Sequence, residues 1–275
     1  MLGPLGARRH IGEGLGFNPA PAAATPFLEA FVTAITDAGG VVPCLFDGRE
    51  GLTSGPFAWV NQTTTVSAGD MVEISGTRTP TIGTSGGYPA VVFERRVPAN
   101  TSTGAKTAAF DASTYTSAAI FCVLSDADVT PLAIPAAFGW GSDAGTFLLY
   151  RNVGGDFATK YVSDDALTSQ EARASAPFSV ASPTLGTTTV DISLLYPQTT
   201  IRRNGVDITT SNAGSTVTGN LASNLFFQVG NPQIVSGAQG WDGSIIFVAV
   251  AMWTGTLSLA AVAAADALVV AEYSL

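Results

Sequence analysis

A succession of short β-prone segments, separated by turn residues, is the feature that most constrains the fold of this 275-residue chain. The sharpest turn signal is Asn204-Gly205, because both positions tolerate the positive φ of a two-residue hairpin. Asn152-Val153-Gly154-Gly155 predicts a second hairpin, and 79–87 is expected to be a long loop. Many short strands at close spacing are typical of an antiparallel β-sandwich or jelly roll. We expect strands at 45–46, 57–60, 63–66, 71–74, 90–94, 118–124, 146–151, 157–163, 187–194, 199–203, 206–210, 225–229 and 244–250.

The stretch from Ser244 to Ala265 carries no charge over 22 residues, and hydropathy alone would place it in a membrane. Two observations oppose that interpretation. Thr254-Gly255-Thr256 interrupts the stretch, and aspartates flank it where a membrane span usually has lysine or arginine. Its first part is β-branched and its last part is alanine-rich, with Ser258 as a helix cap between them. We therefore expect a buried strand, a turn and a short C-terminal helix, with no membrane span.

The N-terminal region combines an arm with a helix. Residues 1–26 are rich in glycine, proline and alanine, which predicts an extended arm. Thr25 and Pro26 suit the start of a helix, and Gly39-Gly40 suits its end. The helix carries one apolar stripe, formed by Phe27, Leu28, Phe31 and Ile35.

Two interpretations of this stripe are open: it packs on its own domain, or it anchors the chain to a neighbouring subunit. The expected organisation is an arm and anchoring helix over 1–40, a β-rich lead-in over 41–81, and the sandwich over 82–275.

Charge and composition exclude several classes of function. The formal net charge is −9, and Lys106 and Lys160 are the only lysines, so a nucleic-acid surface is not expected. Two cysteines, Cys44 and Cys122, lack metal-ligand spacing, and His10 is the single histidine. A serine triad would need His10, which lies in the glycine-rich arm. The arginines near the start are not followed by an apolar run, so we expect no signal peptide.

The C-terminal third resembles the laminin-G-like, concanavalin A-like lectin/glucanase superfamily. The resemblance rests on Thr200–Val206, Leu225–Asn231, Trp241–Val250 and Gly255–Ser258, which stand in the order and spacing of that superfamily. Upstream, Tyr88–Phe93 resembles the entry strand of such domains. The resemblance implies a concanavalin A-like jelly roll, and it is weak on function because such sandwiches carry many activities.

A narrower resemblance concerns the lead-in segment. Leu45–Gly48 and Gln62–Ile74, continuing into Arg78-Thr79-Pro80, are similar to the lead-in of tailed-phage virion proteins that carry this sandwich. The resemblance implies a virion protein that is made in the bacterial host cytoplasm.

Glucanases of the superfamily place two catalytic glutamates two to four residues apart on one strand. The chain has seven glutamates, and none lies within four residues of another. Asp70 and Glu73 are three apart, so a strand would send them to opposite faces. We therefore expect no glucanase activity, and we expect that the protein is not an enzyme.

Two acidic clusters allow two interpretations. One is a Ca²⁺ site, because hard cations take several oxygen ligands and lectin-like sandwiches often hold Ca²⁺ at a rim. The other is turn chemistry at a solvated edge. The residues concerned are Asp126, Asp128, Asp164 and Asp165.

Four aromatic residues could stack on sugars or, as is more common in a sandwich, lie in the core. They are Trp59, Trp140, Tyr150 and Tyr161.

The sequence favours a non-enzymatic structural component of a phage particle, a head or tail decoration or a fibre-like part. Its expected partners are other virion proteins, further copies of the same chain and host-surface glycans. The expected assembly of the copies is a trimer. The alternative is a free carbohydrate-binding lectin module without a virion role.

Overall fold

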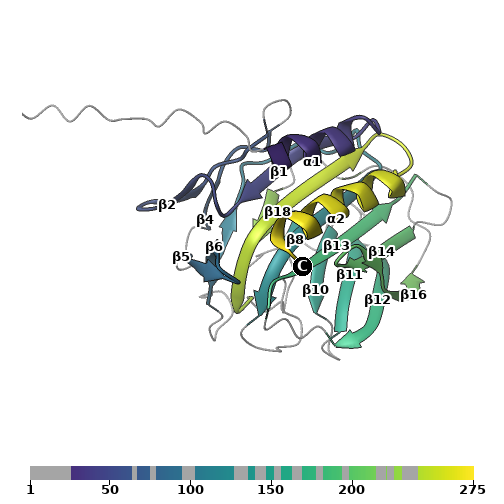
Figure 1. Cartoon of the computed structure of the whole chain (residues 1–275). Coiled ribbons are helices and arrows are strands. Elements are labelled where there is room, and N and C mark those ends of the chain that lie inside the picture. The colour runs from purple at the N-terminus through teal and green to yellow at the C-terminus, as the bar shows by residue number, and fades with distance from the viewer. Residues whose placement is uncertain are drawn as a thin grey trace, which may run out of the picture.

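The computed structural model of the chain describes residues 26–63, 67–74, 79–94, 103–126, 136–139, 147–151, 156–162, 169–177, 182–193, 198–214, 221, 226–230 and 241–275. Two large antiparallel sheets and two helices account for most of these residues (Figure 1). The prediction of a mainly β, antiparallel sandwich with one helix near each end is confirmed.

An eight-stranded sheet forms one layer. Its centre is the pair β8 (Ser117–Asp126) and β18 (Gly243–Trp253), which run antiparallel over almost their whole length. β1 (Val41–Asp47) pairs with the second half of β18, and β6 (Tyr88–Phe93) pairs with the first half. The remaining strands in spatial order are β15 (Val206–Asp207), β14 (Gln198–Arg203) and β13 (Thr184–Asp191) on one side, and β6 (Tyr88–Phe93) and β5 (Thr81–Ser85) on the other.

A ten-stranded sheet forms the second layer. β17 (Phe226–Val229) lies in its middle, between strands from the two halves of the chain. The spatial order is β16 (Thr209–Gly214), β12 (Ser169–Pro177), β11 (Asp156–Val162), β10 (Phe147–Arg151), β9 (Ala136–Gly139), β17, β7 (Ala105–Lys106), β4 (Met71–Glu73), β3 (Phe57–Trp59) and β2 (Leu52–Ser54).

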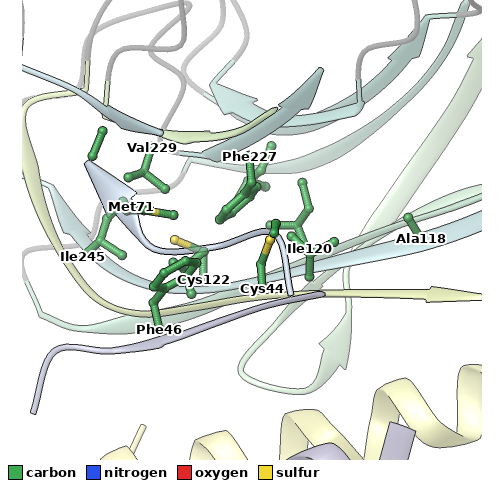
Figure 2. Close-up of a cluster of buried hydrophobic side chains, with 14 of the residues drawn as sticks. Cys44, Phe46, Met71, Ala118, Ile120, Cys122, Phe227, Val229 and Ile245 are labelled. Atoms are coloured by element: carbon green, nitrogen blue, oxygen red, sulfur yellow. The ribbon is translucent and has the colours of Figure 1, made fainter. Parts of the chain in front are cut away.

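The core between the sheets is built from alternating inward side chains. Figure 2 shows Phe227 and Val229 of the ten-stranded sheet above Ile120 and Cys122 of the other sheet. Cys44 and Cys122 are both free and buried there, and burial raises the pKa of each thiol far above its ordinary value. The two cysteines therefore serve as small core residues.

A second apolar layer lies between the eight-stranded sheet and the helices α1 (Pro26–Thr36) and α2 (Leu259–Tyr273). In β18, Val248 and Val250 face the other sheet, whereas Phe247 and Ala249 face the helices. Both faces of this strand are therefore buried, which explains its continuous apolar sequence.

The uncharged C-terminal stretch is a strand, a turn and a helix, as predicted. The Ser258 hydroxyl accepts a hydrogen bond from the Ala261 amide and caps α2. No helix among the described residues has the length and apolar character needed to cross a membrane.

The apolar stripe of α1 forms as predicted, but it does not serve as an anchor to another subunit. All four residues are buried against the chain's own sheet. The Phe31 ring packs edge-on against Phe121 and Phe247, with ring centroids 5.1 and 5.5 Å away. Burial in the chain's own core leaves Phe27, Leu28, Phe31 and Ile35 no surface to offer a partner, so that prediction is wrong.

The strands of the lead-in segment also pair with strands of the sandwich. β1 pairs with β18, while β3 and β4 pair with each other and β4 continues to β7. The sequence predicts boundaries at residues 40 and 81. In the structure, β1 belongs to the eight-stranded sheet, and β2, β3 and β4 belong to the ten-stranded sheet.

Candidate functional site

The two outer surfaces of the sandwich differ in what covers them. α1 and α2 cover the outer surface of the eight-stranded sheet, where they lie on β18 and β8 (Figure 1). Among the described residues, no helix lies on the outer surface of the ten-stranded sheet. This second surface is the candidate functional site.

A single row of paired residues crosses that sheet. Cross-strand partners in antiparallel sheets lie on the same face, so the row can be followed from one strand to the next. From β4 to β12 its members are Val72, Lys106, Gln228, Ala137, Leu148, Lys160 and Glu171. We call this set the lysine row, because it contains both lysines of the chain.

The position of the lysine row on the outer face follows from the core. Phe227 and Val229 are fully buried between the sheets, so Gln228, which lies between them, belongs to the opposite face. Leu149 and Thr159 form a directly paired, buried couple one position away from Leu148 and Lys160. Both ends of the row therefore have the same register relative to the core.

Lys106 has a defined position on this face. Its ammonium nitrogen lies 4.8 Å from the centre of the Phe226 ring, a cation–π contact between diagonal neighbours of two strands. Val72, directly opposite Lys106, is 48% exposed. The site therefore presents an exposed aliphatic side chain and a cation held over an aromatic ring, whereas Gln228 beside them is buried, at 5% exposed.

The four predicted aromatic residues do not come together. Trp59 is fully buried, and its indole N–H donates a 2.9 Å hydrogen bond to the Asp47 carbonyl oxygen. It has no surface for a sugar, so the prediction for Trp59 is wrong. Trp140 lies outside the described residues.

The two tyrosines occupy different rows of the sheet. Tyr150 pairs with Ala158 and shares the face of the lysine row, two residues along from Leu148. Tyr161 pairs with Phe147, whose partner Phe138 pairs in turn with core-facing Phe227. Of the three candidates that the structure describes, Tyr150 alone has a register position on the candidate face.

The predicted Ca²⁺ ligands are not tested by the structure. Asp126 is the last residue of β8, opposite Gly243, while Asp128, Asp164 and Asp165 lie outside the described residues. Across the described part of the chain, no three acidic, histidine or cysteine residues are grouped so that they could hold a metal ion. The Ca²⁺ site stays a prediction.

Two buried aspartates have structural roles under the helices. Asp47 accepts two 3.0 Å hydrogen bonds from Nε of Arg49, and Arg49 also pairs with Glu272 of α2. Its guanidinium lies 4.9 Å from the centre of the Tyr273 ring. This arrangement ties the end of α2 to the turn after β1.

Asp266 forms the second tie. Its carboxylate accepts 2.6 Å hydrogen bonds from Thr187 of β13 and Arg202 of β14. Burial raises the pKa of Asp266, and the hydrogen bonds from Thr187 and Arg202 oppose that rise. Both aspartates are thus already engaged in holding α2 in place.

The sequence did not predict Lys106, Phe226 and Gln228 as site residues. The sequence shows that the chain has two lysines. It does not show that both lie in one row, because that depends on the register of strands far apart in the sequence.

No protein-family model and no curated protein matches the sequence. Among solved structures, domain 4 of AbnA, a GH43 extracellular arabinanase from Geobacillus stearothermophilus determined in complex with arabinotriose, is similar with a TM-score of 0.53 and 12% identity. The match covers 83% of this chain and 98% of that one.

The Trypanosoma rangeli sialidase is similar with a TM-score of 0.50 and 10% identity over 84% of this chain. Only 33% of the sialidase is covered. At these identities the likeness concerns the fold alone, and it agrees with the antiparallel β-sandwich described above.

Proposed function

We propose that this chain is a non-catalytic glycan-binding module whose binding face is the outer surface of the ten-stranded sheet. The observation that carries the proposal is the group on that face: a half-buried aromatic ring with a cation over it, next to an exposed aliphatic side chain. Aromatic and apolar surface with a few placed polar groups is the usual composition of small-molecule sites. The opposite outer surface is occupied by the two helices.

The arabinanase domain supports the proposal. That domain has the same kind of sandwich, matches along nearly its whole length, and was determined with a bound trisaccharide. The absence of closely spaced glutamates in the sequence supports a binding role without glucanase chemistry.

A glycan array tests this function. The full chain is applied with Ca²⁺ and, separately, with a chelator, so that the predicted Ca²⁺ site is tested at the same time. Phe226→Ala should lose most of the binding. Val206→Ala, which changes an exposed residue on the other sheet, should keep it. A folded chain that binds no glycan under either condition would contradict the proposal.

We further propose that the module belongs to a phage particle, as a head or tail decoration or fibre-like protein that assembles with copies of itself. The support is the resemblance of the lead-in segment and the arm that precedes the helix. Mass spectrometry of purified particles tests the location, and light scattering tests whether the free protein is a trimer.

Because α1 is part of the core, a truncation that tests anchoring has to end before Pro26. Deletion of residues 1–25 should abolish incorporation into particles and leave the circular dichroism spectrum unchanged. Normal incorporation of this shortened chain would contradict an anchoring role for the arm.

A further inference from the structure

The two edges of the eight-stranded sheet differ in length and charge. One edge is β15, which has two residues, Val206 and Asp207, and therefore carries a carboxylate. The other edge is β5, whose five residues, Thr81–Ser85, are uncharged and lie at the margin of the sheet beside β6 (Figure 1). Proteins usually protect such an edge with charged residues, proline or a bulge, because its unpaired backbone groups can bind another strand. Within its five residues β5 has none of these protections.

The register of the β5–β6 hairpin shows which backbone groups of β5 face outward. Thr84 pairs with Pro89, which has no N–H, so this pair is not a hydrogen-bonded pair. Hydrogen-bonded and non-hydrogen-bonded pairs alternate along an antiparallel ladder, so Ile82, two residues away, is also in a non-hydrogen-bonded pair. The N–H and C=O groups of Ile82 and Thr84 therefore point away from β6. In the part of the chain that the structure describes, no strand lies on that side of β5.

The side chains at this edge are accessible. Ile82 is 39% exposed, and Thr84 is also exposed. Ile82 pairs with Val91, which is buried in the core between the sheets, so Ile82 lies on the core-facing side of β5, where the core meets solvent. The edge thus combines outward backbone groups with an apolar side chain that a further strand would cover.

We propose that β5 pairs with the β5 strand of a second copy of this chain, antiparallel and about a two-fold axis at Gly83. In this register Ile82 of each copy lies opposite Thr84 of the other, and these are the residues whose backbone groups face outward. Both of these pairs are hydrogen-bonded pairs, in which the two residues exchange N–H···O bonds in both directions. The pairing joins the two eight-stranded sheets into one continuous sheet.

Two features favour a second copy over a strand of another protein. Gly83 meets Gly83 at the axis, where the Cα atoms of a non-hydrogen-bonded pair approach to about 4.5 Å. The chain itself excludes a side chain there, because a Cβ on Gly83 would lie 2.7 Å from Cγ2 of Val92. The segment 79–93 contains no charged residue, so two chains that each have a net charge of −9 meet here without like charges in contact.

This contact goes beyond the proposed glycan binding and does not depend on it. A contact between identical strands is two-fold and gives dimers, so the trimer proposed above would need a different surface. A strand of five residues makes a small interface, and we expect a dissociation constant in the micromolar range.

Sedimentation equilibrium of the full chain over a range of concentrations tests the pairing. The mean mass should rise with concentration from 28.0 kDa, the mass of one chain, toward twice that value. Ile82→Lys places a charge at the edge and should weaken self-association at least about tenfold. Val206→Lys is the matched control, because it makes the same kind of change at an exposed position of the opposite edge and should weaken it less than about twofold. Thermal melts establish that each variant is folded.

NMR hydrogen exchange of the ¹⁵N-labelled chain locates the hydrogen bonds. The amides of Ile82 and Thr84 should exchange at least about fivefold more slowly at high protein concentration than at low concentration, because they are bonded only in the dimer. The Gly83 amide faces β6 and should exchange at the same rate at both concentrations.

The outcomes separate this inference from the proposed function. A mass of 28.0 kDa at every concentration would overturn the pairing. Self-association that Ile82→Lys leaves unchanged, or that Ile82→Lys and Val206→Lys weaken equally, would also overturn it, because the contact would then lie elsewhere. A chain that dimerises through β5 and binds no glycan on the array would overturn the proposed function alone.

Discussion

The two outer surfaces of this sandwich differ in what covers them, and our proposal assigns stability mainly to one surface and binding to the other. The surface of the eight-stranded sheet is apolar and lies under two helices, and ion pairs of Glu272 with Arg49 and of Asp266 with Arg202 hold α2 in place. The surface of the ten-stranded sheet carries an exposed valine and a half-buried lysine and phenylalanine, with a buried glutamine beside them. Substitutions on the first surface should therefore affect mainly folding, and substitutions on the second mainly ligand binding.

The largest effect is expected for Phe31→Ala beneath α1. Phe31 is fully buried and contacts aromatic rings from two central strands. Its truncation should lower the free energy of unfolding by about 3–5 kcal/mol, because it removes buried apolar area and leaves a cavity. Urea unfolding monitored by circular dichroism measures this loss, and a loss below about 1 kcal/mol would show that α1 is not part of the core.

Asp266→Ala should have the next largest effect. The substitution removes the acceptor for Thr187 and Arg202, both of which would be left beneath α2 without this partner. We expect a loss of about 3 kcal/mol, as for other broken buried ion pairs. Asp207→Ala, at an exposed position of β15, is the matched control and should cost much less.

The pH dependence of the same residue sharpens this prediction. Burial raises the pKa of Asp266 above its ordinary value of 3.8, so the folded state favours the protonated acid. The stability from this shift is fully present below pH 3.8 and is lost as the pH rises through the folded-state value. The free energy of unfolding of the wild type, relative to Asp266→Asn, should therefore fall as the pH rises. A relative gain with rising pH would contradict the direction of the shift.

A smaller effect is expected for Ser258→Ala at the start of α2. The hydroxyl caps the Ala261 amide, and its removal should cost about 1 kcal/mol. Ser258→Asp keeps a capping oxygen and should restore most of the stability in the same denaturation experiment. An unchanged Ser258→Ala variant would show that the cap contributes nothing here.

The smallest effect on folding is expected for Phe226→Ala on the outer face of the ten-stranded sheet. Phe226 is half-buried, so its truncation should lower the free energy of unfolding by about 1 kcal/mol or less. Comparison with Phe31→Ala tests the division between the surfaces, since both substitutions remove the same ring. Similar losses in the two variants would contradict it.

Local signals in the sequence were sufficient for much of the fold. Asn204 and Gly205 have φ values of 47° and 80°, and they join β14 to β15 as the hairpin signal predicts. Gly39, with φ of 76°, follows the end of α1. Each of these features depends on residues close together in the chain, which is why the sequence alone predicts them.

Features that depend on distant partners were missed or misassigned. The expected loop at 79–87 contains β5, whose Gly83 and Thr84 gain strand geometry from pairing with β6. β9 and β12 have few β-branched residues and become strands through their neighbours in the ten-stranded sheet.

The candidate site shows the same limit. The sequence contains the residues of the site, but it does not show that they share a face. That face is set by the pairing of β4, β7, β17, β9, β10 and β11. The sequence likewise did not determine which surface α1 packs against. A helix has the same apolar stripe whether it packs on its own sheet or on a neighbouring subunit.

The most direct test of the binding face is an NMR titration of the ¹⁵N-labelled full chain with a glycan that binds on the array. We predict that the amide signals that shift will be those of Met71–Glu73, Ala105–Lys106 and Phe226–Val229, with those of α1 and α2 unchanged. Shifts confined to the two helices, or to the β5–β6 hairpin, would contradict the assignment of binding to the ten-stranded sheet.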